Sequence, residues 1–175
     1  MSISWKRWAW GALAALFTFG LLWGGLWVYR VWAIARPLEA QLAQIPGVEN
    51  PQVRWQGQEV VITLSLAPGA SLGPLLDAVE EKAQARVKAP FRVVFRDNPT
   101  PRLEAFYHEL NPILREGLAT GAFTEMAARV EARGRETEDM AASVYITEDA
   151  IWVLLRDGDR QLIRSIPREK GGAGR

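Results

Sequence analysis

An uninterrupted apolar segment near the amino terminus dominates the hydrophobic pattern. Residues 8–29 contain no charged residue. At 1.5 Å per residue, a helix of this length spans about 33 Å, which is the thickness of a bilayer's hydrocarbon core. The segment therefore predicts a single-pass transmembrane helix after a tail of residues 1–7. The aromatic residues expected to anchor it at the membrane interfaces are Trp5, Trp8, Trp10, Trp27, Tyr29 and Trp32.

A cleaved signal peptide is the alternative for this segment, because Ala33-Ile34-Ala35 resembles a small-residue cleavage site. The apolar run is longer than the core of a signal peptide, so we expect an uncleaved anchor in the cell membrane. Lys and Arg residues are equally frequent at the two ends. The free amino terminus slightly favours a cytoplasmic amino terminus, with the C-terminal domain outside the cytoplasm.

Two glycines one helical turn apart, Gly20 and Gly24, form a GxxxG pattern within this segment. Small residues at this spacing allow two membrane helices to approach closely. Leu13, Leu16 and Trp27 fall on nearly the same face. The pattern predicts a helix–helix interface for self-association, and the alternative is that glycine is simply frequent in membrane helices.

The rest of the chain is expected to form a helical connector over residues 30–50 and one α+β domain over residues 51–168. Period-two and helical repeats of apolar residues alternate along this stretch. One mixed sheet with helices on one face is the expected architecture. The predicted parts are a ββαβ unit (51–97), a helical segment (100–134), a β-meander (143–167) and a disordered tail (169–175).

Individual residues predict where these elements break. Gly57 and Gly158 are typical of hairpin turns, the second because Asp-Gly suits a turn with positive φ. Ser71 is placed to cap the helix of the ββαβ unit. Pro112 is expected to kink or split the first helix of the helical segment.

Composition excludes several classes of chemistry. The 175 residues include no cysteine, which rules out disulfides, thiolate nucleophiles and iron–sulfur clusters. The formal charge of +1 indicates no overall attraction to nucleic acid, so no nucleic-acid partner is expected. The sequence also lacks the common phosphate-binding, nucleophile-elbow and zinc-protease motifs. We therefore expect no catalytic residue, cofactor or metal site.

The one histidine and two acidic residues offer only weak alternatives. His108 follows Glu104 by one helical turn and is explained as a solvated helix residue, with a proton switch as the functional alternative. Asp157 and Asp159 flank Gly158, and the hairpin turn explains them without a metal ion.

Two pairs of adjacent carboxylates could serve acid–base chemistry only if they converged on a substrate. Adjacent helix residues diverge by about 100°, so Glu80-Glu81 is expected to be a solvated face. Glu148-Asp149 is expected to lie in a turn.

Three arginines could gather on one face of the first predicted sheet, and they are Arg54, Arg92 and Arg96. Arg92 and Arg96 share a strand face because side chains alternate along a strand. Such a basic sheet face could bind phosphate or anionic lipid. The alternative is cross-strand pairing with the many glutamates.

Residues 46–97 contain Pro46-Gly47-Val48, the hairpin VRWQGQEVVITLSL, Pro68-Gly69-Ala70-Ser71-Leu72 and the strand FRVVF. This stretch resembles the ββαβ module of the alkaline-shock-protein family, some members of which are membrane-anchored envelope proteins. It is similar in the same way to ring-building modules of secretion and sporulation assemblies. These resemblances imply protein–protein assembly at a membrane without catalysis, and they indicate no functional residue.

The leading hypothesis is a membrane-anchored, non-catalytic interaction or assembly protein of the bacterial cell envelope. Its expected partners are membrane lipid around residues 8–29 and either a second copy or another envelope protein. The first alternative is a sensory or ligand-binding domain. The second is an enzyme with an unrecognised carboxylate site. The sensory alternative requires a pocket between the 102–133 helices and the sheet, lined by Phe106, Tyr107, Phe123 and Trp152.

Overall fold

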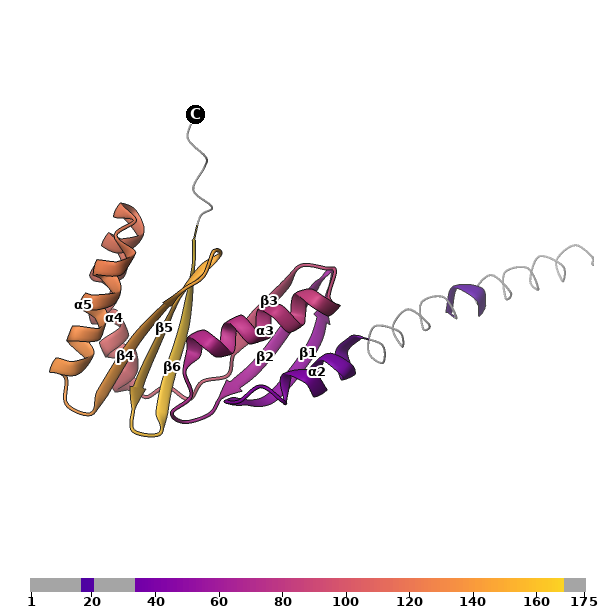
Figure 1. Ribbon diagram of the computed structural model, residues 1–175, viewed down its shortest axis with the longest axis horizontal. Helices are drawn as coiled ribbons and strands as arrows, with labels where there is room; N and C mark the ends of the chain where they lie inside the picture. The colour runs from indigo at the N-terminus through magenta and orange to yellow at the C-terminus, as the bar shows by residue number, and fades with distance from the viewer. Residues whose placement is uncertain (1–16, 21–33, 169–175) are drawn as a thin grey trace, which may run out of the picture.

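The computed structural model describes residues 17–20 and 34–168 (Figure 1). The elements, in chain order, are α2 (Arg36–Leu42), β1 (Val48–Gln56), β2 (Glu59–Leu66), α3 (Leu72–Arg86), β3 (Phe91–Phe95), α4 (Pro101–Thr120), α5 (Phe123–Glu136), β4 (Met140–Ile146), β5 (Ala150–Asp157) and β6 (Arg160–Pro167). Helices and strands are both well represented, so the predicted α+β class is confirmed.

The strands form two three-stranded sheets, which corrects the expected single mixed sheet. In the first sheet β1 pairs antiparallel with β2, and β2 pairs parallel with β3 across the α3 connection. The second sheet is the antiparallel meander β4-β5-β6. The two sheets stay separate at the edge of β6 because side chains replace a neighbouring strand there. The backbone N–H of Ile163 donates to Asp97 Oδ2 at 3.1 Å, and that of Gln161 donates to Asn98 Oδ1 at 3.2 Å.

The predicted membrane-spanning helix is also corrected. Of residues 8–29, the structure describes only residues 17–20, which are helical and expose Phe17 and Phe19; the others lie outside the described residues. Within residues 17–20 and 34–168, no helix has both the length and the apolar character needed to cross a bilayer. Even α4, with 20 residues, carries charged side chains along its exposed face. For the described residues, this finding contradicts the single-pass membrane protein and the cell-membrane localisation expected from the sequence.

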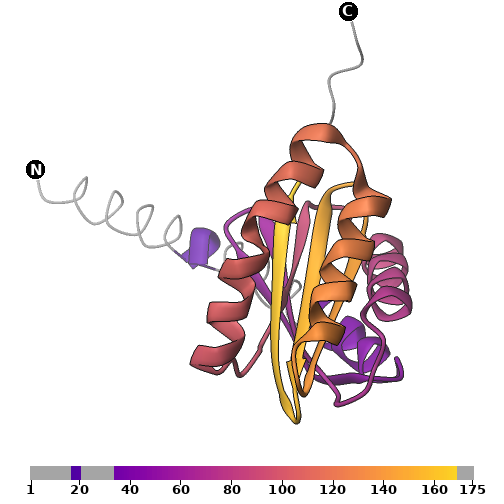
Figure 2. The ribbon, with the colours of Figure 1, turned by 90° about the vertical axis from the view of Figure 1, so that its left-hand side faces the viewer.

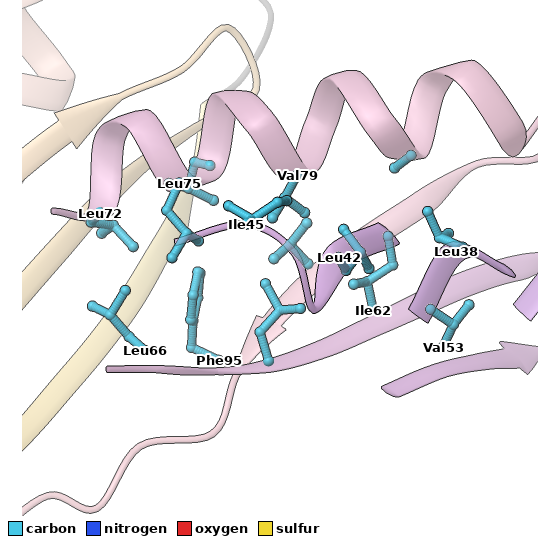
Figure 3. Close-up of a cluster of buried hydrophobic side chains, with 14 of the residues drawn as sticks. Leu38, Leu42, Ile45, Val53, Ile62, Leu66, Leu72, Leu75, Val79 and Phe95 are labelled. Carbon is cyan, nitrogen blue, oxygen red and sulfur yellow. The ribbon is translucent and has the colours of Figure 1, made fainter. Parts of the chain in front are cut away.

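The first hydrophobic core lies between the first sheet and the two helices α2 and α3 (Figure 3). Leu42 of α2 and Val79 of α3 point into it, as does Ile62 of β2, because one apolar stripe of each element faces the same layer. The short helix α2 also covers the edge of β1, where Val53 N–H donates to Glu39 Oε1 at 2.7 Å. One face and one edge of this sheet are therefore occupied by the chain itself.

The second sheet is covered on both of its faces. Its one face packs against α4 and α5, which lie in front of β4–β6 in Figure 2. Its other face packs against the first core, where the Trp152 ring meets the Phe95 ring edge-on at 5.5 Å between centroids. Residues 151–155 of β5 are accordingly all buried. The second sheet thus forms the middle layer between the two helix layers.

The local turn signals have mixed outcomes. Gly57 and Gly158 have φ of +66° and +58° and lie in the two predicted hairpin turns. Ser71 precedes α3 but makes no side-chain cap hydrogen bond. Pro112 does not split α4, which runs continuously to Thr120 and is capped at its start by Thr100 Oγ1, which accepts from Leu103 N–H at 3.2 Å.

Candidate functional site

No element within residues 34–168 covers the outer face of the first sheet, which we call the open face. Along β2, side chains alternate between the buried Val60, Ile62 and Leu64 and the partly exposed residues between them. The strand register places neighbouring residues of β1 and β3 on the same outer side. The members of the open face are Gln52, Arg54, Gln56, Glu59, Val61, Thr63, Ser65, Arg92, Val94 and Arg96.

The three predicted arginines lie together on the open face. Arg54 and Arg92 flank Val61 in a single cross-strand row, since Val61 pairs with both of them. Arg96 follows on the same side of the chain just after β3, and all three arginines are exposed. Val94 lies between Arg92 and Arg96 and is 37% exposed. The centre of the open face is therefore a small apolar strip with basic side chains on both sides.

Acidic residues on the open face neutralise part of this charge. Arg92 Nη2 lies 3.8 Å from Glu59 Oε2 and donates to Gln56 Oε1 at 3.4 Å. This is the cross-strand pairing considered as the alternative for these arginines. Within the described part of the chain, neither Arg54 nor Arg96 forms a salt bridge. Among the described residues, the guanidinium groups of Arg54 and Arg96 therefore have no carboxylate partner.

A cluster of carboxylates lies on the outer side of α3, which we call the acidic cluster. It consists of Asp77 and Glu80 of α3 and of Glu148 and Asp149 in the β4–β5 turn. Burial raises the pKa of Glu80, and the nearby charges of Asp77, Asp149 and Glu148 raise it further. Because α3 covers the inner side of the first sheet, the acidic cluster and the open face lie on opposite sides of that sheet (Figure 1).

Close packing between α3 and β4 brings the acidic cluster together. A Cβ atom at Gly73 would lie 2.7 Å from the Tyr145 ring, so glycine is needed for this approach. Tyr145 O–H donates to Asp77 Oδ1 at 2.6 Å. This hydrogen bond is the main cause that raises the pKa of Tyr145 to about 12.

Sequence reasoning missed the acidic cluster. It treated Glu80-Glu81 and Glu148-Asp149 as two separate pairs, each without a converging partner. The structure joins one member of the first pair to both members of the second. No local pattern predicts this, because it depends on how the second sheet packs against α3.

A hollow of about 960 Å³ opens at the carboxyl-terminal end of α3. Lys82, Arg86 and Lys88 line it together with Glu81 and the Trp55 ring. We call it the basic hollow. It lies at the opposite end of α3 from Asp77, so the exposed side of this helix changes from acidic to basic along its length.

The other residues singled out in the sequence do not form a site. His108 is exposed on α4, with its ring 6.2 Å from that of Tyr107. Asp157 lies 3.3 Å from Arg102 in an ion pair, and Asp159 is exposed in the hairpin turn. Across residues 17–20 and 34–168, no group of three or more histidine or carboxylate side chains is arranged to bind a metal ion.

The pocket expected for a sensory domain does not form from the residues proposed for it. Phe106 is buried in the core beneath α4, whereas Trp152 lies on the other face of the second sheet. Phe123 is covered by the Arg168 guanidinium at 4.5 Å from the ring centroid. These aromatic residues belong to different layers and cannot line one cavity.

The GxxxG interface and the aromatic anchors fall almost entirely outside the described residues. Gly20 is helical, and no described atom lies within 4 Å of the position its Cβ would take. The residues that lie outside the description are Leu13, Leu16, Gly24, Trp27, Trp5, Trp8, Trp10, Tyr29 and Trp32.

Comparison with known proteins found no family model, no curated protein and no solved structure that matches the chain. The resemblance of residues 46–97 to the alkaline-shock-protein module therefore stays a prediction.

Proposed function

We propose that the protein is a non-catalytic interaction module that associates with further copies of itself through the open face of its first sheet. The observation that carries the proposal is the unequal coverage of the two sheets. Both faces of the second sheet are packed against other elements, while the outer side of the first sheet is left exposed.

The edge of the first sheet at β1 is protected, whereas its outer face is exposed. Strand β1 has its edge N–H at Val53 bonded by Glu39, and its register shifts between Glu49 and Gln52. Covered edges and irregular edge strands hinder pairing with another strand. We therefore do not expect a partner strand to extend the sheet at β1, and we expect the partner to dock on the open face.

Charge complementarity favours a second copy as the partner. Arg54, Arg92 and Arg96 outnumber Glu59 on the open face, and the opposite side of the same unit carries the four carboxylates of the acidic cluster. The open face of one copy can therefore lie against the acidic cluster of the next. Such a contact joins two different surfaces, so it can repeat from copy to copy.

The size of the open face determines how strongly we expect the protein to self-associate. Three strands spaced about 4.8 Å apart make a narrow surface, smaller than the roughly 800 Å² per partner of a standard interface. We therefore expect weak association, which is detected at protein concentrations of about 0.1–1 mM.

Sedimentation equilibrium of the full chain tests the proposal. The wild-type chain should show an average mass that rises with concentration and falls with added salt, because exposed charges are screened. Replacing the open-face arginines should abolish the rise, whereas replacing three exposed arginines elsewhere should not. The test variant is Arg54→Gln/Arg92→Gln/Arg96→Gln and the control is Arg115→Gln/Arg135→Gln/Arg160→Gln.

The proposal fails if the wild-type chain stays monomeric at 1 mM. It also fails if the open-face triple variant associates as strongly as the wild-type chain, or if the control variant loses association to the same extent as the open-face variant. Thermal unfolding of each variant shows whether a lost association reflects a lost fold.

A further inference from the structure

Both apolar and charged side chains line the basic hollow at the end of α3. The apolar ones include Ile34, the Trp55 ring and Ala85. The basic ones are Lys82, Arg86 and Lys88, and Glu81 is the acidic residue among the lining side chains. The volume of about 960 Å³ lies within the range of small-molecule sites. A ligand that suits this mixed lining carries a negative charge on one part and an apolar group on another.

Arg86 makes one side-chain hydrogen bond at the hollow. Its Nε donates to Gln41 Oε1 of α2 at 2.9 Å, which leaves the two Nη nitrogens as further donors. A guanidinium can bind phosphate through two parallel hydrogen bonds.

The cations of the hollow differ from the five described arginines that form salt bridges. Arg102, Arg129 and Arg164, for example, each lie within 3.3 Å of a carboxylate oxygen. Among the described residues, Lys82, Arg86 and Lys88 take part in no salt bridge. Three positive charges therefore meet at one concavity with little compensation.

Stabilisation of the helix end explains only part of this arrangement. Basic side chains near the last turn of a helix interact favourably with its carbonyl groups, which accounts for Lys82 and Arg86. Lys88 lies beyond the end of α3 at Arg86, and the apolar lining residues such as Trp55 have no role in such an interaction. A bound ligand would explain why charged and apolar side chains line the same hollow.

We infer that the basic hollow binds a small anionic amphiphile, in which a phosphate group is attached to an apolar chain. The phosphate contacts Arg86 and the two lysines, and the apolar chain lies against Trp55 and Ala85. This site is separate from the open face and does not depend on self-association. It gives the protein a ligand-binding activity in addition to its proposed interaction role.

Isothermal titration calorimetry of the full chain with decyl phosphate tests the inference. Inorganic phosphate supplies the charged group alone, and decyl glucoside supplies the apolar chain without the charge. Decyl phosphate should bind more tightly than either of them, and its affinity should fall as salt is added.

Variants locate the binding. Arg86→Gln and Lys82→Gln should each weaken decyl phosphate binding, the first by about tenfold or more because a charge-assisted hydrogen bond is lost. Arg115→Gln, the same chemical change at an exposed position of α4, should leave the affinity unchanged. The inference is overturned if decyl glucoside binds as tightly as decyl phosphate, or if Arg86→Gln binds decyl phosphate as the wild-type chain does.

Discussion

The contact between α4 and α5 at Gly117 leads to a prediction whose sign depends on two opposing effects. Gly117 is buried within α4, and a Cβ atom there would lie 2.6 Å from Met126 Cβ and 2.7 Å from its Cγ. In a helix, alanine is more favourable than glycine by about 1 kcal/mol. Overpacking a close contact costs about 1–3 kcal/mol. Met126 cannot remove the clash by changing rotamer, because its Cβ is fixed to the α5 backbone.

We therefore expect Gly117→Ala to lower the free energy of unfolding by up to about 2 kcal/mol, the difference between the two effects. Urea denaturation followed by circular dichroism measures this change. Ala105→Gly, at an exposed interior position of the same helix, is the control for helix propensity and should lose about 1 kcal/mol. If propensity alone mattered, Gly117→Ala would gain what Ala105→Gly loses. A gain of that size would show that α4 and α5 do not approach as closely as described.

Three further predictions concern the acidic cluster and the contact between the two sheets. Asp77→Asn should lower the pKa of Tyr145 from about 12 toward its ordinary value of 10, which the absorbance of the phenolate measures. The stability contributed by the neutral phenol is complete below pH 10 and is lost as the pH rises to about 12. An unchanged titration would contradict the hydrogen bond. Glu80→Gln should raise the melting temperature at pH 7, because a raised folded-state pKa means that ionised Glu80 destabilises the fold. This gain should disappear below pH 4.5, where the unfolded chain is also protonated, and a gain that persists there would have another cause. A double-mutant cycle of Phe95→Leu and Trp152→Leu should give a coupling energy of about 0.5–1.5 kcal/mol, and a value near zero would place the rings apart.

Local periodicity predicted most of the individual elements. The alternation in residues 91–95 predicted β3, and the Asp157-Gly158 pair predicted the turn between β5 and β6. These predictions succeed because backbone geometry and one-sided burial determine which residue types occur at neighbouring positions.

The division into two sheets is less evident from the sequence. Residues 151–155 read as a continuous apolar run, which is typical of a strand buried on both faces, and this signal was available in the sequence. The edge of β6, by contrast, is satisfied by the side chains of Asp97 and Asn98, more than sixty residues away. No short-range pattern predicts such a contact.

The candidate sites also differ in whether the sequence could predict them. Strand alternation placed Arg92 and Arg96 on one face, and the register adds Arg54 beside Val61. The acidic cluster and the basic hollow both require the packing of α3 against other elements, β4 in one case and α2 in the other. Surfaces built from a single sheet could therefore be predicted, and surfaces built between elements could not.

Mixing two variants, each with one altered surface, tests the proposed self-association most directly. One variant carries the open-face changes Arg54→Gln/Arg92→Gln/Arg96→Gln, and the other carries the acidic-cluster changes Asp77→Asn/Glu80→Gln/Glu148→Gln. Each variant alone should sediment as a monomer. A 1:1 mixture should form dimers and nothing larger, because the two remaining native surfaces can meet only once. A mixture that stays monomeric while the wild-type chain associates, or either variant associating alone, would contradict the contact between the open face and the acidic cluster.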